Sequence, residues 1–202
     1  EQPKEIADCA AVHGMTPLAL LLQSVQVDHR FTAVHCTHSL PDELEAYVRE
    51  GANVCICPLT EGSLGDGVFR ALGPSRGNVC LGSDCNARID MLEEMRWLEY
   101  TQRLVRGQRG VYSAASGDAD LPRRLLDCAT RHGARSLGVE AGTIEPGKWA
   151  DFALLDLRAS AVAGADAHSL LGAAIFGGSC EALVVDTCVA GRWTRDEQRN
   201  IA

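Results

Sequence analysis

The sequence predicts an α/β fold, in which helices cover a parallel sheet, followed by a smaller β-rich segment. Through about residue 140, short apolar runs typical of strands alternate with segments of helical periodicity. Repeated strand–loop–helix units of this size place their strands parallel to one another. After residue 140, turn-forming residues separate further strand-like runs. We therefore expect an α/β part over 1–140 and a β-rich part over 141–202.

The expected strands of the α/β part are short apolar runs that end on polar residues or on proline. They lie at 31–35, 53–57 and 78–82. The expected helices carry apolar stripes, acidic or proline-containing first turns, or a glycine near their ends. They lie at 4–12, 16–25, 39–50, 90–106 and 120–132, with Gly51 and Gly133 as the terminating glycines of two of them. The helix 90–106 is expected to bury Met91, Met95, Leu98 and Leu104, and 59–67 is expected to be a glycine-rich loop.

The β-rich part opens with turn residues and then alternates strands with one helical stretch. Turns are expected at 142–147, strands at 150–157, 182–185 and 187–193, and a helix at 166–175. The polar end, 194–202, is expected to fray.

Composition excludes several classes of protein. The 202 residues include 27 acidic and 19 basic side chains, giving a net charge of −8, which argues against a nucleic-acid partner. No apolar run approaches the length of a membrane span, and residues 1–10 lack the features of a signal peptide. Because an initiator Met is also missing, we expect a fragment of a longer protein.

Nine cysteines, several inside apolar runs, indicate a reduced, cytoplasmic protein. A cysteine zinc site is disfavoured because no C-x-x-C spacing occurs. The close pair Cys55 and Cys57 is expected to point its side chains in opposite directions.

Two strand ends carry residues suited to chemistry. His35 closes one strand and Asp84 follows another, about fifty residues later. In a parallel barrel these ends converge on one mouth, where a carboxylate can bind a divalent ion and an imidazole can polarise the reacting group. Plainer interpretations stay open: His35 as a hydrogen-bonded structural residue, and Asp84 as a cap of the turn or of the next helix.

Other candidate motifs are weaker. His38 lies three residues after His35 but beyond the strand, so the pair does not share a helical face. The glycine-rich loop lacks the Gly-Lys-Ser/Thr ending of a phosphate-binding loop. Ser83 lacks the Gly-x-Ser-x-Gly elbow of a serine hydrolase.

Five segments together resemble the amidohydrolase-superfamily deaminases and, within them, the formimidoylglutamate deiminase family of histidine degradation. They are Val34-His-Cys-Thr-His38, Cys57-Pro-Leu-Thr-Glu-Gly-Ser-Leu-Gly-Asp-Gly67, Gly82-Ser-Asp84, Glu93-Glu-Met-Arg-Trp-Leu-Glu-Tyr-Thr-Gln-Arg-Leu104 and Gly142-Thr-Ile-Glu-Pro-Gly-Lys-Trp-Ala-Asp-Phe152. Gly-Ser-Asp and the last segment mark only the superfamily, whereas Leu64–Gly67 in the second segment and Arg96–Leu104 in the fourth point to the deiminases. The resemblance covers essentially the whole chain.

The resemblance implies the C-terminal part of a metal-dependent (β/α)₈ TIM barrel over 1–140. Residues 141–202 would return to a composite β-sandwich. It implies hydrolysis of N-formimidoyl-L-glutamate to N-formyl-L-glutamate and ammonia, with one divalent metal ion, expected to be Zn²⁺. Asp84 would ligate the metal and accept a proton from water, His35 would polarise the attacking water and the tetrahedral centre, and Glu1 would shuttle protons. His38 and Glu61 receive no role.

The chain also departs from the family pattern. The His-x-His pair of the first strand and the His of the fifth are missing, so one of four expected metal ligands is present, and the chain alone is expected to be inactive. One alternative is another amidohydrolase, such as a guanine- or adenosyl-type aminohydrolase or a triazine chlorohydrolase relative. Others are a half-barrel completed by a partner, or a binding domain without chemistry. The intact enzyme is expected to be a homodimer acting on a small molecule.

Overall fold

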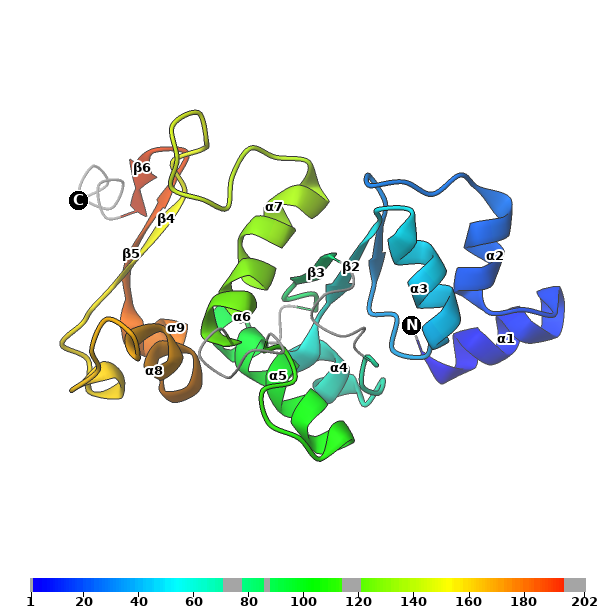
Figure 1. Ribbon diagram of the computed structural model, residues 1–202, viewed down its shortest axis with the longest axis horizontal. Coiled ribbons are helices and arrows are strands. Elements are labelled where there is room, and N and C mark those ends of the chain that lie inside the picture. The colour runs from blue at the N-terminus through cyan, green and yellow to red at the C-terminus, as the bar shows by residue number, and fades with distance from the viewer. Residues whose placement is uncertain (1, 71–77, 86–87, 114–120, 195–202) are drawn as a thin grey trace.

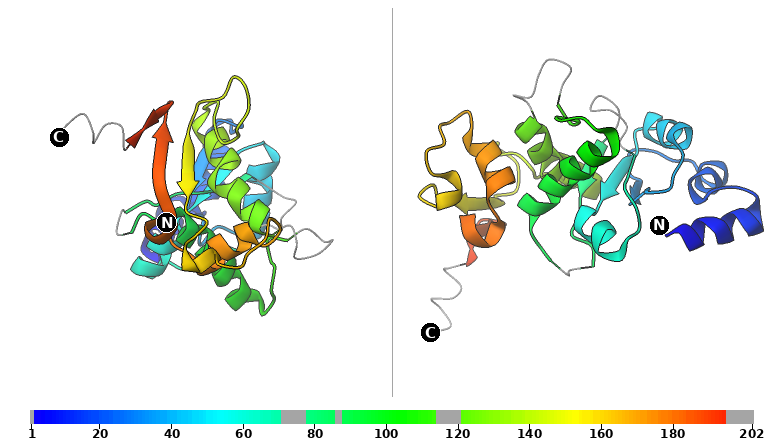
Figure 2. Two further views of the ribbon diagram at one scale, coloured as in Figure 1. Left: turned by 90° about the vertical axis from the view of Figure 1, so that its left-hand side faces the viewer. Right: turned by 90° about the horizontal axis from the view of Figure 1, so that it is seen from below.

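The computed structural model describes residues 2–70, 78–85, 88–113 and 121–194 (Figure 1). A parallel sheet lies in the middle of an elongated chain, with the first three helices on one side and α5, α6 and α7 on the other. A second, antiparallel sheet lies at the end of the molecule opposite to the N-terminal helices (Figure 2). The mixture of helices with a parallel sheet is therefore as predicted, whereas the C-terminal segment combines its antiparallel strands with several helical pieces. The division at residue 140 and the assignments to a barrel and a sandwich stay predictions.

The parallel sheet contains β1 (Thr32–Val34), β2 (Asn53–Ile56) and β3 (Asn78–Leu81), in that order. Thr32 pairs with Asn53, and Asn53 with Asn78, so the three strands run in register and their carboxyl ends reach the same edge. Val54 and Ile56 of the central strand are buried in the hydrophobic core. Because side chains alternate along a strand, the intervening residues face the opposite side of the sheet.

The three N-terminal helices begin as their sequences predict. Each has proline in its first turn, where the missing N–H costs nothing. They are α1 (Pro3–His13), α2 (Pro17–Ser24) and α3 (Pro41–Arg49). The helix expected at 39–50 has Leu40 as its N-cap, and the Glu43 carboxylate accepts the backbone N–H of Leu40 at 3.3 Å.

The expected glycine-rich loop at 59–67 is wrong over most of its length. Residues Pro58–Leu64 form the short helix α4, and Gly65 ends it in the left-handed region at φ +72°. Gly62 lies inside the helix, where an added Cβ would come within 3.4 Å of the Trp97 ring. This is an ordinary van der Waals distance, so Gly62 marks a point where α4 lies next to the following helix, α5.

Helix α5 (Met91–Arg106) matches its predicted range, but one member of its predicted stripe is wrong. Met95 and Leu98 are buried, whereas Leu104 is 84% exposed. After Met95 and Leu98, the helical spacing brings Gln102 to the core side, and its amide donates to the Phe69 carbonyl at 2.6 Å.

The helix expected at 120–132 is two helices, α6 (Leu121–Ala129) and α7 (Arg131–Leu137), and residue 120 lies outside the described residues. Gly133 does not end a helix. It lies within α7, which ends at Gly138 at φ +66°. The apolar pattern continues through Ala134, which is buried, so the chain keeps helical geometry beyond Gly133.

The second sheet is built from β4 (Phe152–Leu155), β5 (Val184–Val189) and β6 (Arg192–Trp193), all antiparallel. The predicted strands 182–185 and 187–193 are therefore one strand and a short partner. They are joined at Ala190 and Gly191, both with positive φ, +51° and +80°, as in a tight hairpin turn. Three helical pieces connect β4 to β5: a 3₁₀ turn (Ser160–Val162), α8 (Leu170–Gly177) and α9 (Cys180–Leu183). The predicted frayed end, apart from Thr194, lies outside the described residues.

Within the described part of the chain, no single helix has both the length and the apolar character to cross a membrane. The bent pair α1 and α2, which meet at 51°, passes that test only jointly.

Candidate active site

The site forms where the parallel strands end. His35 follows β1 and Asp84 follows β3, and both have left-handed backbones, at φ +69° and +48°. Cys36, next to His35, also has a positive φ, of +52°. Residues other than glycine adopt a left-handed backbone at some cost in energy, and residues with such backbones are often found at functional sites. A backbone hydrogen bond of 2.8 Å from His35 N–H to the Cys55 carbonyl holds the first of these turns against β2.

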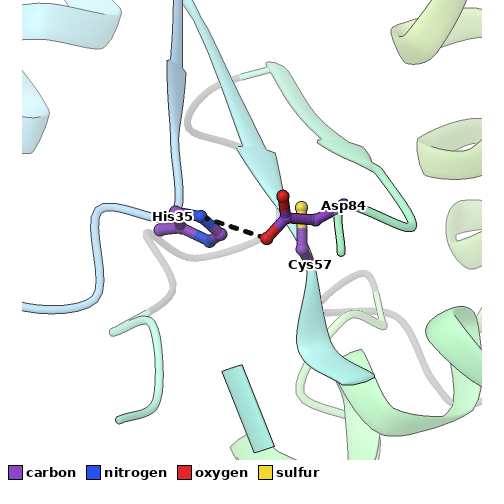
Figure 3. A group of neighbouring side chains, drawn as sticks. All are labelled: His35, Cys57 and Asp84. Atoms are coloured by element: carbon purple, nitrogen blue, oxygen red, sulfur yellow. Dashed lines mark ion pairs between the residues drawn. The ribbon is translucent and has the colours of Figure 1, made fainter. Parts of the chain in front are cut away.

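The two predicted residues lie together, as Figure 3 shows. Nε2 of His35 is 3.5 Å from Oδ2 of Asp84, and the two side chains are 16% and 37% exposed. Cys57, at the end of β2, completes a group in which one donor atom from each residue lies within 4.8 Å of the others. Imidazole nitrogen, thiolate and carboxylate are the ligand types that zinc takes in proteins. The convergence expected of the strand ends is therefore confirmed.

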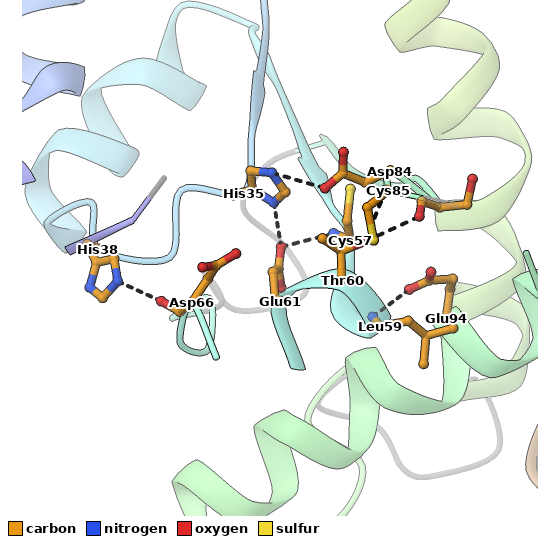
Figure 4. A network of polar contacts seen from close by, with 11 residues as sticks. His35, His38, Cys57, Leu59, Thr60, Glu61, Asp66, Asp84, Cys85 and Glu94 are labelled. Atoms are coloured by element: carbon orange, nitrogen blue, oxygen red, sulfur yellow. Dashed lines mark hydrogen bonds and ion pairs between the residues drawn. The ribbon is translucent and has the colours of Figure 1, made fainter. Parts of the chain in front are cut away.

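Glu61 of α4 lies behind His35. Its Oε1 is 3.2 Å from Nδ1 of His35 and accepts the backbone N–H of Cys57 at 3.0 Å (Figure 4). Glu61 is only 4% exposed, and this burial raises the pKa of its carboxyl group, while the hydrogen bond from Cys57 and the His35 ring oppose the rise. The imidazole is therefore held between two carboxyl groups, Glu61 on one ring nitrogen and Asp84 on the other.

Thr60, also on α4, holds the loop that carries Asp84. Its hydroxyl lies 3.3 Å from the Ser83 carbonyl and 3.3 Å from Sγ of Cys85, and it accepts the Cys85 backbone N–H at 3.3 Å. Two consecutive residues of α4 thus contact the ends of two strands: Glu61 contacts His35 after β1, and Thr60 contacts the loop after β3 that carries Asp84.

Glu94 of α5 is hydrogen-bonded to the first turn of α4. It is fully buried, and its Oε2 accepts the backbone N–H of Leu59, in the first turn of α4, at 3.0 Å. Burial first, and then the charges of Glu61, Glu93 and Asp84, raise the pKa of Glu94 to about 7. Among the residues that the structure describes, Oε1 of Glu94 has no hydrogen-bond partner.

The thiols of Cys55 in β2 and of Cys57 just after it lie on the same side of the sheet. A Cβ added to Gly82 would lie 3.0 Å from Sγ of Cys55 and 3.2 Å from Sγ of Cys57, so both sulfurs lie on the same side. The expectation that they point in opposite directions is wrong, because residues two apart in a strand share a face. The hydrogen-bonded thiol of Cys57 raises the pKa of Cys55 to about 12. All nine cysteines of the described chain are free thiols.

Three further candidates from the sequence are Glu1, His38 and Ser83. Glu1 lies outside the described residues. His38 lies apart from His35, and its Nε2 donates to the Asp66 carbonyl at 2.6 Å, which holds the chain after α4 (Figure 4). The backbone carbonyl of Ser83 lies 3.3 Å from the Thr60 hydroxyl.

Sequence reasoning gave Thr60 and Glu61 no role because it placed 59–67 in a loop. Glu94 lies in a correctly predicted helix, but its contact with Leu59, 35 residues earlier, is not visible in the sequence. One signal was present: Pro58 and Gly65 are a typical first residue and a typical terminating residue of a short helix. A helix at that position would have turned Glu61 back toward the end of β2.

Comparison with known proteins agrees with this geometry. The model of the Amidohydrolase family matches residues 1–194. The formimidoylglutamate deiminase of Pseudomonas aeruginosa is 38% identical over 202 residues, covering 99% of this chain and 44% of that protein. An amidohydrolase from Brucella melitensis has a similar structure, with a TM-score of 0.83 and 32% identity over 99% of this chain and 46% of that one. An adenosine deaminase from Xanthomonas campestris with bound zinc gives 0.80 and 28% identity over 96% of this chain and 43% of its own. The chain thus spans less than half the length of these relatives.

Proposed function

Because the chain belongs to the amidohydrolase family, we propose that it forms part of a metal-dependent hydrolytic deaminase. The favoured substrate is N-formimidoyl-L-glutamate, and the products are N-formyl-L-glutamate and ammonia. One observation carries the proposal: an imidazole and a carboxylate 3.5 Å apart at the carboxyl ends of two strands of one parallel sheet. The similarity to a formimidoylglutamate deiminase over 99% of the chain supports the choice of substrate.

A divalent metal ion, with zinc as the proposed ion, fits the donors at this position in part. Asp84 would hold it, and its carboxylate is one of the harder ligands that such ions accept. A zinc site needs at least three protein ligands, so the metal depends on donors beyond Asp84. When bound, the ion supplies the Lewis acidity that makes water a nucleophile near neutral pH.

Asp84, His35 and Glu1 would each have a separate role in the reaction at the attacked carbon. Water adds to the C=N carbon of the formimidoyl group, and Asp84 takes the proton that water loses. His35 stabilises the polar tetrahedral adduct that follows. The C–N bond to the terminal nitrogen then breaks, and that nitrogen leaves as ammonia once it has gained a proton, the role we assign to Glu1.

A second candidate is deamination of a purine nucleoside, supported by the similarity to the adenosine deaminase with bound zinc. Both reactions add water to a C=N carbon and release ammonia, so the same residues serve either one. The two differ in the groups that hold the rest of the substrate: cations for the two carboxylates of formimidoylglutamate, and apolar surface for a purine.

The decisive experiment begins with the coding sequence upstream of Glu1 and the full-length protein. We expect that sequence to encode His-x-His after an early strand and a His three residues before Glu1. We expect the purified protein to release ammonia from N-formimidoyl-L-glutamate and not from adenosine or guanine. Release from a nucleoside alone would establish the second candidate, and release from none of them would refute the deaminase proposal.

Two further proposals concern the state of the protein in the cell. We propose a homodimer, which sedimentation of the full-length protein tests. We also propose a cytoplasmic location, supported by nine free thiols in a chain of this size.

A further inference from the structure

We propose that Glu61 is a positioning residue for His35. It holds the imidazole with Nδ1–H directed to the Glu61 carboxylate and with Nε2 directed to Asp84. The geometric part of this inference stands on the contacts below. Its consequence for catalysis rests on the deaminase function proposed above.

The hydrogen bonds around Oε1 of Glu61 indicate which atom carries the proton. The backbone N–H of Cys57 can only donate, so Oε1 acts as an acceptor in that bond at 3.0 Å. Oε1 also faces Nδ1 of His35 at 3.2 Å, and a carboxylate oxygen there accepts the ring N–H. A neutral imidazole carries one proton, so Nε2 is left with its lone pair.

The carboxylate is held where it is by more than its own side chain. Helix α4 is tied to α5 through Leu59 and Glu94, and to the loop after β3 through Thr60. Glu61 is 4% exposed, so little water reaches the carboxylate to compete for the ring N–H. The ring itself is fixed from the other side by the left-handed backbone of His35 and its bond to the Cys55 carbonyl. Two separate elements therefore set one orientation of the imidazole.

This orientation gives His35 a defined part in the reaction. Nε2 and Oδ2 of Asp84, 3.5 Å apart, both present lone pairs to the same reacting water. When that water attacks, one O–H bond breaks and its proton goes to Asp84, while the second O–H donates to Nε2 of His35. With the opposite tautomer, Nε2–H would face Asp84 and the ring would offer the water no acceptor. A change of tautomer alone lowers turnover strongly in enzymes that use an oriented histidine.

The test reads the tautomer directly and does not depend on turnover. Long-range ¹H–¹⁵N spectra of the labelled full-length protein distinguish protonated from unprotonated ring nitrogens, and His35→Asn identifies the His35 signals. We expect a protonated Nδ1 and an unprotonated Nε2 in the wild-type protein and in Glu61→Gln, whose amide oxygen still accepts. In Glu61→Leu, we expect Nε2–H to appear, with kcat lower by about 100-fold or more and KM changed by less than about 3-fold.

The matched control is Glu99→Gln on α5. Glu99 is also fully buried and accepts backbone N–H groups, from Val111 and Tyr112, but it pairs with Arg103 instead of a histidine. We expect this variant to leave the His35 signals unchanged.

The inference is overturned if wild-type His35 carries its proton on Nε2, or if Glu61→Leu keeps the wild-type tautomer. If Glu61→Leu does not fold, the wild-type spectrum alone decides. If the wild-type protein releases no ammonia from any substrate tested, the proposed function fails, and the spectra still decide the role of Glu61.

Discussion

Replacement of Glu94 by glutamine should abolish a large part of the pH dependence of stability. Glu94 is fully buried, accepts one hydrogen bond from Leu59 N–H, and has a pKa raised from 4.5 to about 7 by burial and by neighbouring carboxylates. Between these two pH values the unfolded chain has ionised this group, while the folded protein still holds the proton. Unfolding then releases a proton, so stability falls as pH rises from about 4.5 to about 7.

The size of the effect follows from the two values. At ~1.4 kcal/mol for each pH unit, the difference between 4.5 and about 7 amounts to about 3 kcal/mol of lost stability. Glutamine has nearly the same shape and keeps an oxygen for Leu59 N–H, but it does not ionise. Any constant cost of burying its NH₂ group acts equally at every pH, so the change between pH 5 and pH 8 isolates the ionisation.

The assay is urea unfolding of the metal-free protein and of Glu94→Gln at pH 5, 6, 7 and 8. We expect the wild-type free energy of unfolding to decrease by about 2.5 kcal/mol more than that of the variant between pH 5 and pH 8, because part of the full effect is already lost at pH 5. The exposed Glu145→Gln serves as the control and should follow the wild type. Parallel pH curves for the wild type and Glu94→Gln would refute the argument that Glu94 holds its proton in the folded protein.

Three further substitutions probe the site and its support. Gly82→Ala should cost about 1–3 kcal/mol in urea unfolding, because the new methyl group would lie 3.0 Å from Sγ of Cys55. Adding Cys55→Ala should recover part of that loss, and equal midpoints for Gly82→Ala and the wild type would contradict the steric reason. Asp84→Asn should weaken zinc binding by more than about 10-fold with little change in stability, as measured by competition with a chelator. Full retention of zinc would remove Asp84 from the metal site. Arg96→Met should cost about 1–3 kcal/mol, because the guanidinium donates to the Ile175 carbonyl at 2.8 Å and ties α5 to α8. An unchanged urea midpoint would show that this tie contributes nothing.

The sequence was sufficient for those elements whose signals are local. Helices α1 to α3 begin at prolines, and the three parallel strands are short apolar runs, so their positions follow from propensity and spacing. The proximity of His35 and Asp84 was predictable for a similar reason, because the carboxyl ends of parallel strands lie at the same edge of the sheet.

Helix α4 shows where such reasoning fails. Its first turn is hydrogen-bonded to Glu94, 35 residues later, and its glycine lies next to Trp97 of the same helix α5. Neither contact is visible in the segment itself, so local composition indicates a loop. The role of Glu61 was missed as a consequence, because only a helix turns its carboxylate back toward Cys57 and His35.

The exposure of Leu104 has a different cause. The stripe was chosen by residue type, but the spacing that passes through Met95 and Leu98 continues to Gln102. Burial of the glutamine is possible because its amide finds the Phe69 carbonyl, a partner 33 residues away in sequence.

The left-handed backbones of His35, Cys36 and Asp84 also bear on how this protein can be engineered. Each departs from the conformation its side chain prefers, by about 1 kcal/mol or more. Laboratory selection for heat resistance alone would therefore favour glycine or asparagine at these positions, and at His35 and Asp84 it would remove the two side chains to which we assign the proposed chemistry. Ala190, left-handed in a hairpin turn remote from the strand ends, offers the same gain without that loss. A library designed to raise thermostability should therefore vary Ala190 in the hairpin and leave His35, Cys36 and Asp84 unchanged.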